Sequence, residues 1–396
     1  MPAAPPARRP PGTPPRAPAG RGTSGRRTAV IGASVAAVVV IAAVTAAVVF
    51  RGDVAGTGTT VAGSTTAAAV PTSSALSTSS QLVEASSSAA PSTSAPEPVP
   101  GLPQSTPLPE EVLIGSRSVE GSSNLYQFDA ATGALGKQLT TGSAGTQFAI
   151  LSPDRGSIIY LQTGPAGSTL RTMAVDGTGD RELFTQLPTG CTGLFRPAWN
   201  PIDQTTLALT CAAADGTTKL YQVSVDGSDP REIDTGFPVV DDVTYSPDGR
   251  TLAFWGSESP GVEGTIFTMP VDVSEAAKQL VDRAPGSSDA DPTFSPDGGK
   301  IAFRRVTTAN GAVTAQIIVV NTDGSNPVPL TDGTSVDQDP IWSPNGEQIA
   351  FKSNRRNAEG TNDSEIWVIN ADGTGLKELA VGSPGTGDGA PAWGHR

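Results

Sequence analysis

The stretch Asp337–Ser353, DQDPIWSPNGEQIAFKS, decides the fold because it encodes two short strands joined by a tight turn. Ile341 and Trp342 end one apolar run, and Gln348 begins the next. The Ser-Pro-Asn-Gly segment between the two runs is a turn signal, since proline presets φ at its second position and glycine closes it.

The same pattern recurs along the chain. Clear copies lie at Asp289–Arg305 and Asp241–Gly256, and weaker copies lie at Gln147–Gln162 and Phe195–Cys211. The turn prolines are spaced by 48, 46, 49 and 48 residues; they are Pro153, Pro201, Pro247, Pro296 and Pro344. A fixed period in this range predicts a repeat architecture.

The second half of each unit is equally regular. A third strand-like run is followed in four units by an Asp-Gly turn, a strong hairpin signal: Asp176-Gly177, Asp226-Gly227, Asp323-Gly324 and Asp372-Gly373. A short fourth run comes after it. Four strands in about 48 residues predict one blade of a β-propeller, so we expect an all-β domain.

The two ends of the repeat region indicate the number of blades. Val112–Thr140 supplies the second, third and fourth strands of a unit but no first strand. Gly389–Gly394 resembles a first strand, with Trp393 in the place of Trp342. We therefore predict six four-stranded blades, closed into a ring by the C-terminal strand, because closure removes open sheet edges.

Charge is distributed unevenly along the 396 residues, whose net charge is −13. Residues 1–51 contain seven arginines and no acid, whereas residues 111–396 contain 19 bases and 35 acids. So acidic a domain repels phosphate, and we expect no nucleic-acid partner.

The N-terminal 110 residues differ in composition from the repeats. Residues 1–27 are rich in Pro, Ala, Gly and Arg, and we expect a disordered cytoplasmic tail. Residues 28–50 are uncharged and long enough to span a membrane, with arginines on the expected cytoplasmic side. An uncleaved signal anchor is our prediction; a cleaved signal peptide is the alternative. Residues 51–110 predict a Ser/Thr/Ala/Pro-rich linker.

The repeats resemble those of the TolB-like β-propeller family. The residues that carry this resemblance are Ser343–Gly346 with Ile349–Phe351, and Ile366–Gly373. The resemblance covers residues 111–396 and implies the propeller fold and an extracytoplasmic location. Similar propellers serve as protein-binding modules or as gating domains of peptidases. A membrane-anchored chain without a preceding α/β domain departs from the TolB pattern, so the family's partners are not carried over.

Acidic residues precede the first strands in register. Asp242, Asp291 and Asp339 occupy one position, where Arg196 stands in another unit. Asp289, Asp337 and Asp388 occupy the position two residues earlier. First strands are innermost in a propeller, so we expect these residues at one mouth of the central channel. They form either a site for a basic partner group or a divalent cation, or turns in which each Asp accepts backbone N–H bonds.

Two further sets of residues carry structural expectations. Cys191 and Cys211 flank one predicted hairpin in which residue 194 faces residue 211, so we predict a disulfide outside the cytoplasm. Aromatic residues recur at one position of the unit, as a stacking surface for sugars or, in our preferred interpretation, as packing between blades: Trp199, Tyr245, Phe294, Trp342 and Trp393.

Catalytic signatures are scarce. The chain has one histidine, His395, and no G-x-S-x-G serine motif, so we expect no enzyme and no bound cofactor. The sequence favours a membrane-anchored, extracytoplasmic propeller that binds a protein, peptide or cell-envelope polymer. A carboxylate-dependent hydrolase or lyase at the channel mouth and a ligand sensor are the alternatives.

Overall fold

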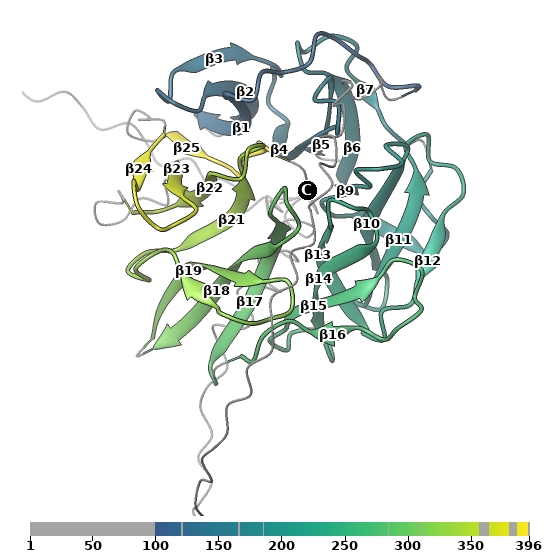
Figure 1. Ribbon diagram of the computed structural model, residues 1–396. Helices are drawn as coiled ribbons and strands as arrows, with labels where there is room; N and C mark the ends of the chain where they lie inside the picture. Colours follow the sequence, from purple (N-terminus) through teal and green to yellow (C-terminus); the bar gives the residue numbers. More distant parts are fainter. Residues whose placement is uncertain are drawn as a thin grey trace, which may run out of the picture. The chain divides into compact units, whose positions relative to one another are not determined.

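The computed structural model describes residues 100–119, 122–164, 167–184, 186–283, 285–309, 311–355, 364–379 and 386–394. The expected tail, membrane span and most of the linker lie outside these residues. The described residues form six antiparallel sheets around a common centre, which confirms the predicted six-bladed β-propeller (Figure 1). No helix among them has the length and apolarity that a membrane span requires.

Blades 1 to 3 are built from the first half of the domain. Blade 1 contains β25 (Thr386–Asp388), β1 (Val112–Val119), β2 (Ser122–Asp129) and β3 (Leu135–Gln138). Blade 2 contains β4 (Gly145–Leu151), β5 (Ser157–Gly164), β6 (Gly167–Ala174) and β7 (Arg181–Glu182). Blade 3 contains β8 (Cys191–Leu194), β9 (Ala198–Trp199), β10 (Thr206–Ala213), β11 (Thr218–Ser224) and β12 (Arg231–Ile233).

Blades 4 to 6 follow the sequence repeat most closely. Blade 4 contains β13 (Val239–Tyr245), β14 (Thr251–Ser257), β15 (Thr265–Pro270) and β16 (Lys278–Gln279). Blade 5 contains β17 (Ser287–Phe294), β18 (Lys300–Ala309), β19 (Ala312–Asn321) and β20 (Val328–Pro329). Blade 6 contains β21 (Asp337–Trp342), β22 (Gln348–Ser353), β23 (Glu365–Asn370) and β24 (Lys377–Glu378).

The turn between the first and second strands has the geometry that its sequence predicts. In blade 4 the N–H of Gly249 donates to the carbonyl of Ser246, and Gly249 has φ 68°. The hydroxyl of Ser246 donates to Asp248 at 2.6 Å, and the N–H of Thr251 donates to that hydroxyl at 2.9 Å. Serine, glycine and an Asp or Asn side-chain oxygen, which Asn345 supplies in blade 6, thus act together in this turn, which explains why the tetrapeptide recurs.

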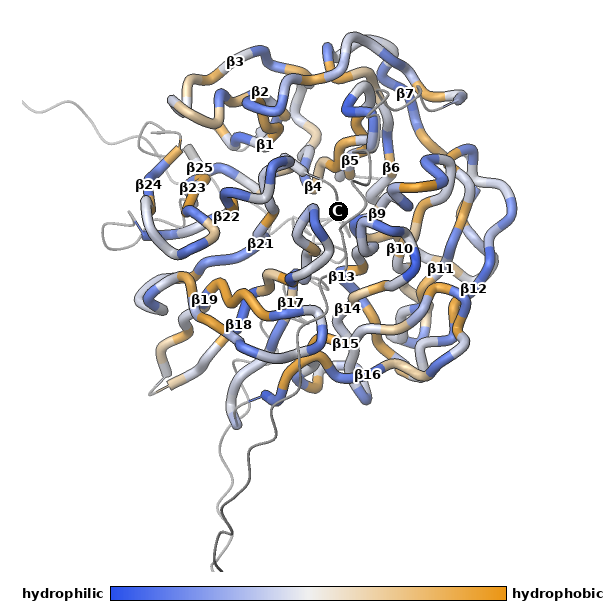
Figure 2. Tube along the Cα trace, viewed as in Figure 1, coloured by the Kyte–Doolittle hydropathy of each residue, from blue (hydrophilic) through white to orange (hydrophobic). Residues whose placement is uncertain are grey.

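The core lies within and between the blades, where hydrophobic residues concentrate in the strands while the turns are mostly hydrophilic (Figure 2). The recurring aromatic residues are at most 6% exposed: Trp199, Tyr245, Phe294, Trp342 and Trp393. Trp342 packs against blade 5, and its Nε1–H donates to the carbonyl of Thr293 at 3.2 Å. These residues therefore pack between blades, as we expected.

The C-terminal strand completes blade 1. Strand β25 pairs with β1 through Arg117↔Asp388 and Val119↔Thr386, and an isolated bridge joins Ile114 to Ala392. Trp393 packs with Leu113, and its Nε1–H donates to Glu110 at 2.6 Å. The predicted closure is confirmed. The regular strand lies at Thr386–Asp388, earlier than the expected Gly389–Gly394. After Pro391, which has no N–H to donate to a strand ladder, only the isolated bridge forms.

Residues just before the first strand also pack onto the propeller. The N–H of Leu108 donates to the carbonyl of Arg155 at 2.9 Å, and Ser157 donates through its hydroxyl to the carbonyl of Pro103 at 2.6 Å. Leu108 is buried. The propeller thus includes contacts made by residues that the sequence analysis assigned to the linker.

Candidate functional site

A β-bulge recurs in the first strand of four blades. Asp242, Asp291, Asp339 and Phe148 have φ between 52° and 55°, and the strand register shifts at each of them. This left-handed conformation is unfavourable for most residues, but aspartate tolerates it better than most. The bulges bring Asp242, Asp291 and Asp339 together with Arg196, and we call these four residues the axial cluster.

Hydrogen bonds link the axial carboxylates from blade to blade. The N–H of Asp291 donates to the carboxylate of Asp242 at 3.4 Å, and the N–H of Asp339 donates to the carboxylate of Asp291 at 3.1 Å. The expected N–H acceptors are present, but each bond joins neighbouring blades instead of closing a turn. The bulged backbone therefore connects blades 4, 5 and 6 around the centre.

Arg196 joins opposite sides of the ring. Its guanidinium donates to Asp339, so blade 3 is paired with blade 6 across the centre. The first strand of blade 3 is interrupted between β8 and β9, where Pro197 cannot donate a ladder hydrogen bond. The Arg196 guanidinium also lies 4.3 Å from the centre of the Phe148 ring of blade 2. This stacking is favourable for a buried cation.

Two further cations flank the axial cluster, and the sequence argument missed them. Arg304 forms an ion pair with Asp291 at 3.1 Å and donates to Gln338 at 2.9 Å. Lys352, at the equivalent position of blade 6, acts electrostatically on Asp339. Both directly follow the Ala-Phe pair of a second strand, a position facing the bulge that could have been identified from the repeat.

Two neighbouring carboxyl groups of the axial cluster have pKa values that are shifted in opposite directions. Burial raises the pKa of Asp291 to about 6, with Asp242 and Asp339 adding to it and Arg304 opposing it. Burial tends to raise the pKa of Asp339 as well. The positive charges of Arg196 and Lys352 outweigh this effect and lower the pKa of Asp339 to about 2. Asp339 is therefore ionised at neutral pH, and Asp291 is the more readily protonated member of the pair.

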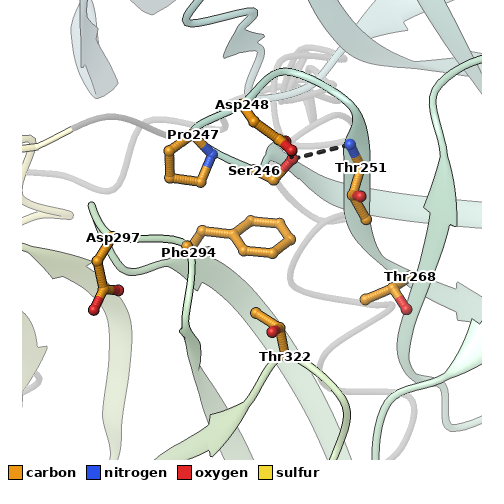
Figure 3. Close-up of a pocket in the computed structure, with 9 residues that line it drawn as sticks. Ser246, Pro247, Asp248, Thr251, Thr268, Phe294, Asp297 and Thr322 are labelled. Carbon is orange, nitrogen blue, oxygen red and sulfur yellow. Dashed lines mark hydrogen bonds between the residues drawn. The ribbon is translucent and has the colours of Figure 1, made fainter. Parts of the chain in front are cut away.

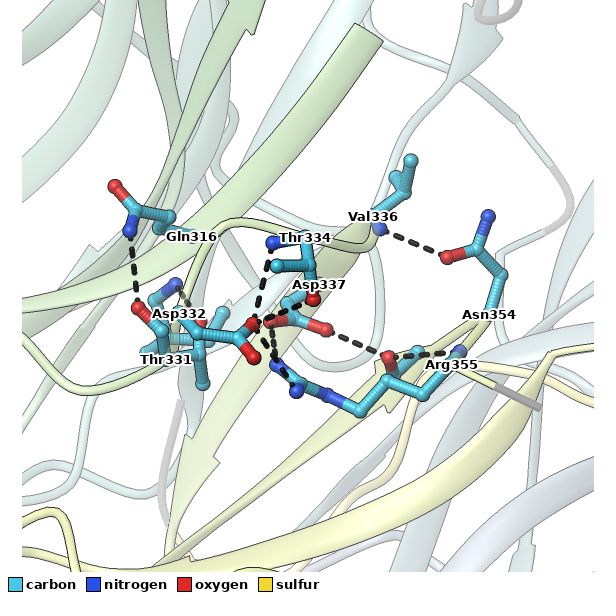
Figure 4. Close-up of polar contacts among 10 residues, drawn as sticks. Gln316, Thr331, Asp332, Thr334, Val336, Asp337, Asn354 and Arg355 are labelled. Atoms are coloured by element: carbon cyan, nitrogen blue, oxygen red, sulfur yellow. Dashed lines mark hydrogen bonds and ion pairs between the residues drawn. The ribbon is translucent and has the colours of Figure 1, made fainter.

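The strand-start acids Asp289, Asp337 and Asp388 belong to a different arrangement. Each is buried and paired with an arginine: Asp289 with Arg305 at 2.7 Å, Asp337 with Arg355 at 2.5 Å, and Asp388 with Arg117 at 2.7 Å. Figure 4 shows Arg355 also reaching Asp332, at 3.2 Å. The seven candidate residues thus divide into an axial cluster and three ion pairs.

A cation site finds no support in the described part of the chain. No three His, Cys, Asp or Glu side chains there are grouped so that they could hold a metal. The axial carboxylates contact Arg196, Arg304 and backbone N–H groups instead.

The disulfide between Cys191 and Cys211 is present, as predicted, with Cα atoms 5.5 Å apart. Leu194 faces Cys211 in the β8–β10 pairing, which is the register expected from the sequence. Cys211 is buried with Trp199 and Leu209 in the core of blade 3. The bridge anchors β8 just before the interruption that carries Arg196.

One recess among the described residues lies away from the axial cluster. It has a volume of about 600 Å³ and lies between the turns of blades 4 and 5, with Phe294 among the side chains that line it (Figure 3). Asp248 and Asp297 flank it, and hydrogen bonds from Ser246 and Ser295 lower the pKa of these two carboxyls. None of the residues singled out as a candidate charged site lines this recess.

The fold and the axial cluster define a six-bladed β-propeller of a class typical of binding modules. Residues 151–395, more than half of the chain, match the TolB beta propeller domain, and the protein belongs to this family. Among solved structures, TolB from Acinetobacter baumannii is similar, with 19% identity over 71% of this chain and a TM-score of 0.58. This chain spans 65% of that protein.

Other solved propellers show how widely the fold is used. A protein of Agrobacterium tumefaciens assigned as TolB has 20% identity over 68% of this chain and 88% of its own, with a TM-score of 0.52. A chain of the nidogen/laminin complex has 10% identity over 71% of this chain and 97% of its own, with the same TM-score of 0.52. At these identities the similarity concerns the fold alone.

Proposed function

We propose that this protein is a binding or scaffolding module for a protein, a peptide or a cell-envelope polymer. In this proposal residues 28–50 anchor it in the membrane and the propeller lies outside the cytoplasm. The axial cluster is the observation that carries the proposal. Charged side chains of both signs from blades 3, 4, 5 and 6 converge there, and a ligand with charged groups can exchange for these partners.

Two half-buried residues, Asp242 in the axial cluster and Lys352 beside it, offer the clearest test. Asp242→Asn and Lys352→Gln change the charge at the centre without removing the Arg196–Asp339 ion pair. Full-length tagged protein in mild detergent is used to capture partners from an envelope extract, and bound components are identified by mass spectrometry. We expect both variants to lose the specific partner by at least about tenfold, which corresponds to about 1.4 kcal/mol.

The recess between blades 4 and 5 supplies the control. Asp248→Asn alters an exposed acid there and should bind the partner as the wild type does. Equal capture by all four proteins places the binding surface elsewhere and contradicts the assignment to the axial cluster.

A carboxylate-dependent hydrolase or lyase is the second candidate. It is favoured by one observation: neighbouring environments raise the pKa of Asp291 and lower that of Asp339, as in acid–base pairs of enzymes. Turnover of an envelope polysaccharide or peptide by the wild type, abolished by Asp291→Asn and retained by Asp248→Asn, supports this alternative over simple binding.

A further inference from the structure

Two buried carboxyl groups meet where blade 6 contacts the closing strand of blade 1. Asp388 of β25 accepts hydrogen bonds from the Arg117 guanidinium at 2.7 and 3.0 Å, and its side chain is fully buried. Its N–H donates to the carbonyl of Ser364. Glu365, the next residue and the first of β23, is 6% exposed and acts electrostatically on both Asp388 and Arg117.

The repeat shows what this position normally contributes. Strand pairing makes Thr265 of blade 4, Gln316 of blade 5 and Glu365 of blade 6 equivalent, since their partners Gly256, Arg305 and Ser353 occupy the same place in the second strand. Thr265 donates its hydroxyl to Asp289, the strand-start acid of the following blade, at 3.3 Å.

Blade 6 therefore has a carboxyl group where the two preceding blades have neutral hydrogen-bond donors. Ionised, Glu365 has no proton to donate and adds a second negative charge beside Asp388, where Arg117 is the neighbouring cation. Glu378 of β24 adds further negative charge, and Tyr126 of β2 lies near Arg117. The Oε2 atom of Glu365 has no hydrogen-bond partner among the described residues. Only a protonated Glu365 can donate to Asp388 as Thr265 donates to Asp289.

We propose that Glu365 and Asp388 form a proton-dependent latch between blade 6 and the strand that closes the ring. While Glu365 carries a proton, its hydroxyl donates to Asp388 and β25 is held against β23. When the proton leaves, two carboxylates face each other in a buried site and β25 is repelled from blade 6. The stability of ring closure thus decreases as the surroundings become more alkaline.

The direction of the pH effect follows from linkage. Burial, followed by the charge of Asp388, raises the pKa of Glu365 from 4.5 to about 8. Between these values the folded protein binds a proton that the unfolded chain releases, so the free energy of unfolding falls as pH rises. The stabilising contribution is complete below the unfolded value and is lost as pH passes through the folded value.

Thermal unfolding of the full-length chain in mild detergent tests the latch across pH 6 to 9. Glu365→Gln supplies the neutral donor that blade 5 already uses at this position, and Glu347→Gln, at an exposed acid of the same blade, is the matched control. We expect the melting temperature of the wild type and of Glu347→Gln to fall over this range by on the order of 5 °C more than that of Glu365→Gln.

A substitute variant and an infrared measurement complete this test. Glu365→Thr, the residue of blade 4, replaces Glu365→Gln if that variant does not fold. The infrared difference spectrum between folded wild type and Glu365→Gln should contain a protonated-carboxyl band at pH 7 that weakens towards pH 9, because the contribution of Asp291 is common to both proteins and cancels. Parallel pH profiles for wild type and Glu365→Gln, or a difference spectrum without this band, overturn the proposal.

Discussion

The guanidinium of Arg155 donates a hydrogen bond to the backbone carbonyl of Trp393, 238 residues further along the chain. The same guanidinium donates to the carbonyls of Leu108, Pro109 and Val112 at 2.8, 2.9 and 2.8 Å. Arg155 lies in the first turn of blade 2, Ser-Pro-Asp-Arg-Gly, at the position that the turn glycine Gly249 occupies in blade 4. A departure from the repeat thus joins both ends of the propeller at one side chain.

Replacing Arg155 by alanine should destabilise the propeller by about 3 kcal/mol or more, because four backbone carbonyls lose a charged donor. Urea unfolding measures the change. Arg250→Ala provides the control: Arg250 follows the equivalent turn of blade 4 and is exposed, so it should change stability by less than about 0.5 kcal/mol. Equal effects of the two substitutions contradict a closing role for Arg155.

Deleting Asp388–Arg396 removes the Arg117–Asp388 ion pair, the Ile114–Ala392 bridge and the buried Trp393. Loss of a buried tryptophan alone typically costs about 3–5 kcal/mol. We therefore expect the shortened chain to melt far lower than the full chain or to aggregate. Equal melting temperatures for chains ending at residues 387 and 396 would reject ring closure as a source of stability.

The repeat and its ends were sufficient to predict the blade number, the closing strand and the disulfide register. The reason is that strand alternation, turn chemistry and a constant period all specify the same architecture. The division of the seven candidate residues was not predictable in this way. Asp291 and Asp289 lie two residues apart, yet a bulge places one in the axial cluster and the other against Arg305. A local change in backbone conformation decides which partner each meets.

Removing one partner of the Arg196–Asp339 ion pair should strongly lower the free energy of unfolding. Both side chains are largely buried, at 7% and 12% exposed, so Asp339→Ala leaves Arg196 poorly compensated and should cost about 3–5 kcal/mol. Replacing both partners by leucine should recover part of that loss. A double variant no more stable than Asp339→Ala contradicts a direct pairing energy.

Acid titration checks the same pair independently. The pKa of Asp339 lies below its ordinary 3.8, so its stabilising contribution is present above that value and is lost as pH falls towards 2. The stability difference between wild type and Asp339→Asn should therefore shrink from pH 5 to pH 2. A difference that stays constant over this range argues against an ionised Asp339 in the folded protein.

Reduction of the Cys191–Cys211 disulfide should lower the stability of blade 3. The bridge joins residues 20 apart, and a loop of this size typically stabilises by about 3 kcal/mol. We expect the Cys191→Ser/Cys211→Ser double variant to unfold at correspondingly lower urea concentration, with faster hydrogen exchange at the backbone N–H groups of residues 194 and 211. Non-reducing peptide mapping of native protein should recover the linked pair, whereas two freely alkylated thiols contradict it.

The last prediction concerns orientation in the membrane. Six of the seven arginines within residues 1–51 precede the uncharged segment 28–50, and such charges are retained on the cytoplasmic side. Protease added to intact, wall-stripped cells should therefore digest the propeller, whereas a cytoplasmic marker protein stays intact. The disulfide is consistent with this side, since such bonds persist outside the reducing cytoplasm. Digestion that begins only after the cells are lysed places the propeller inside and rejects both the orientation and an extracytoplasmic ligand.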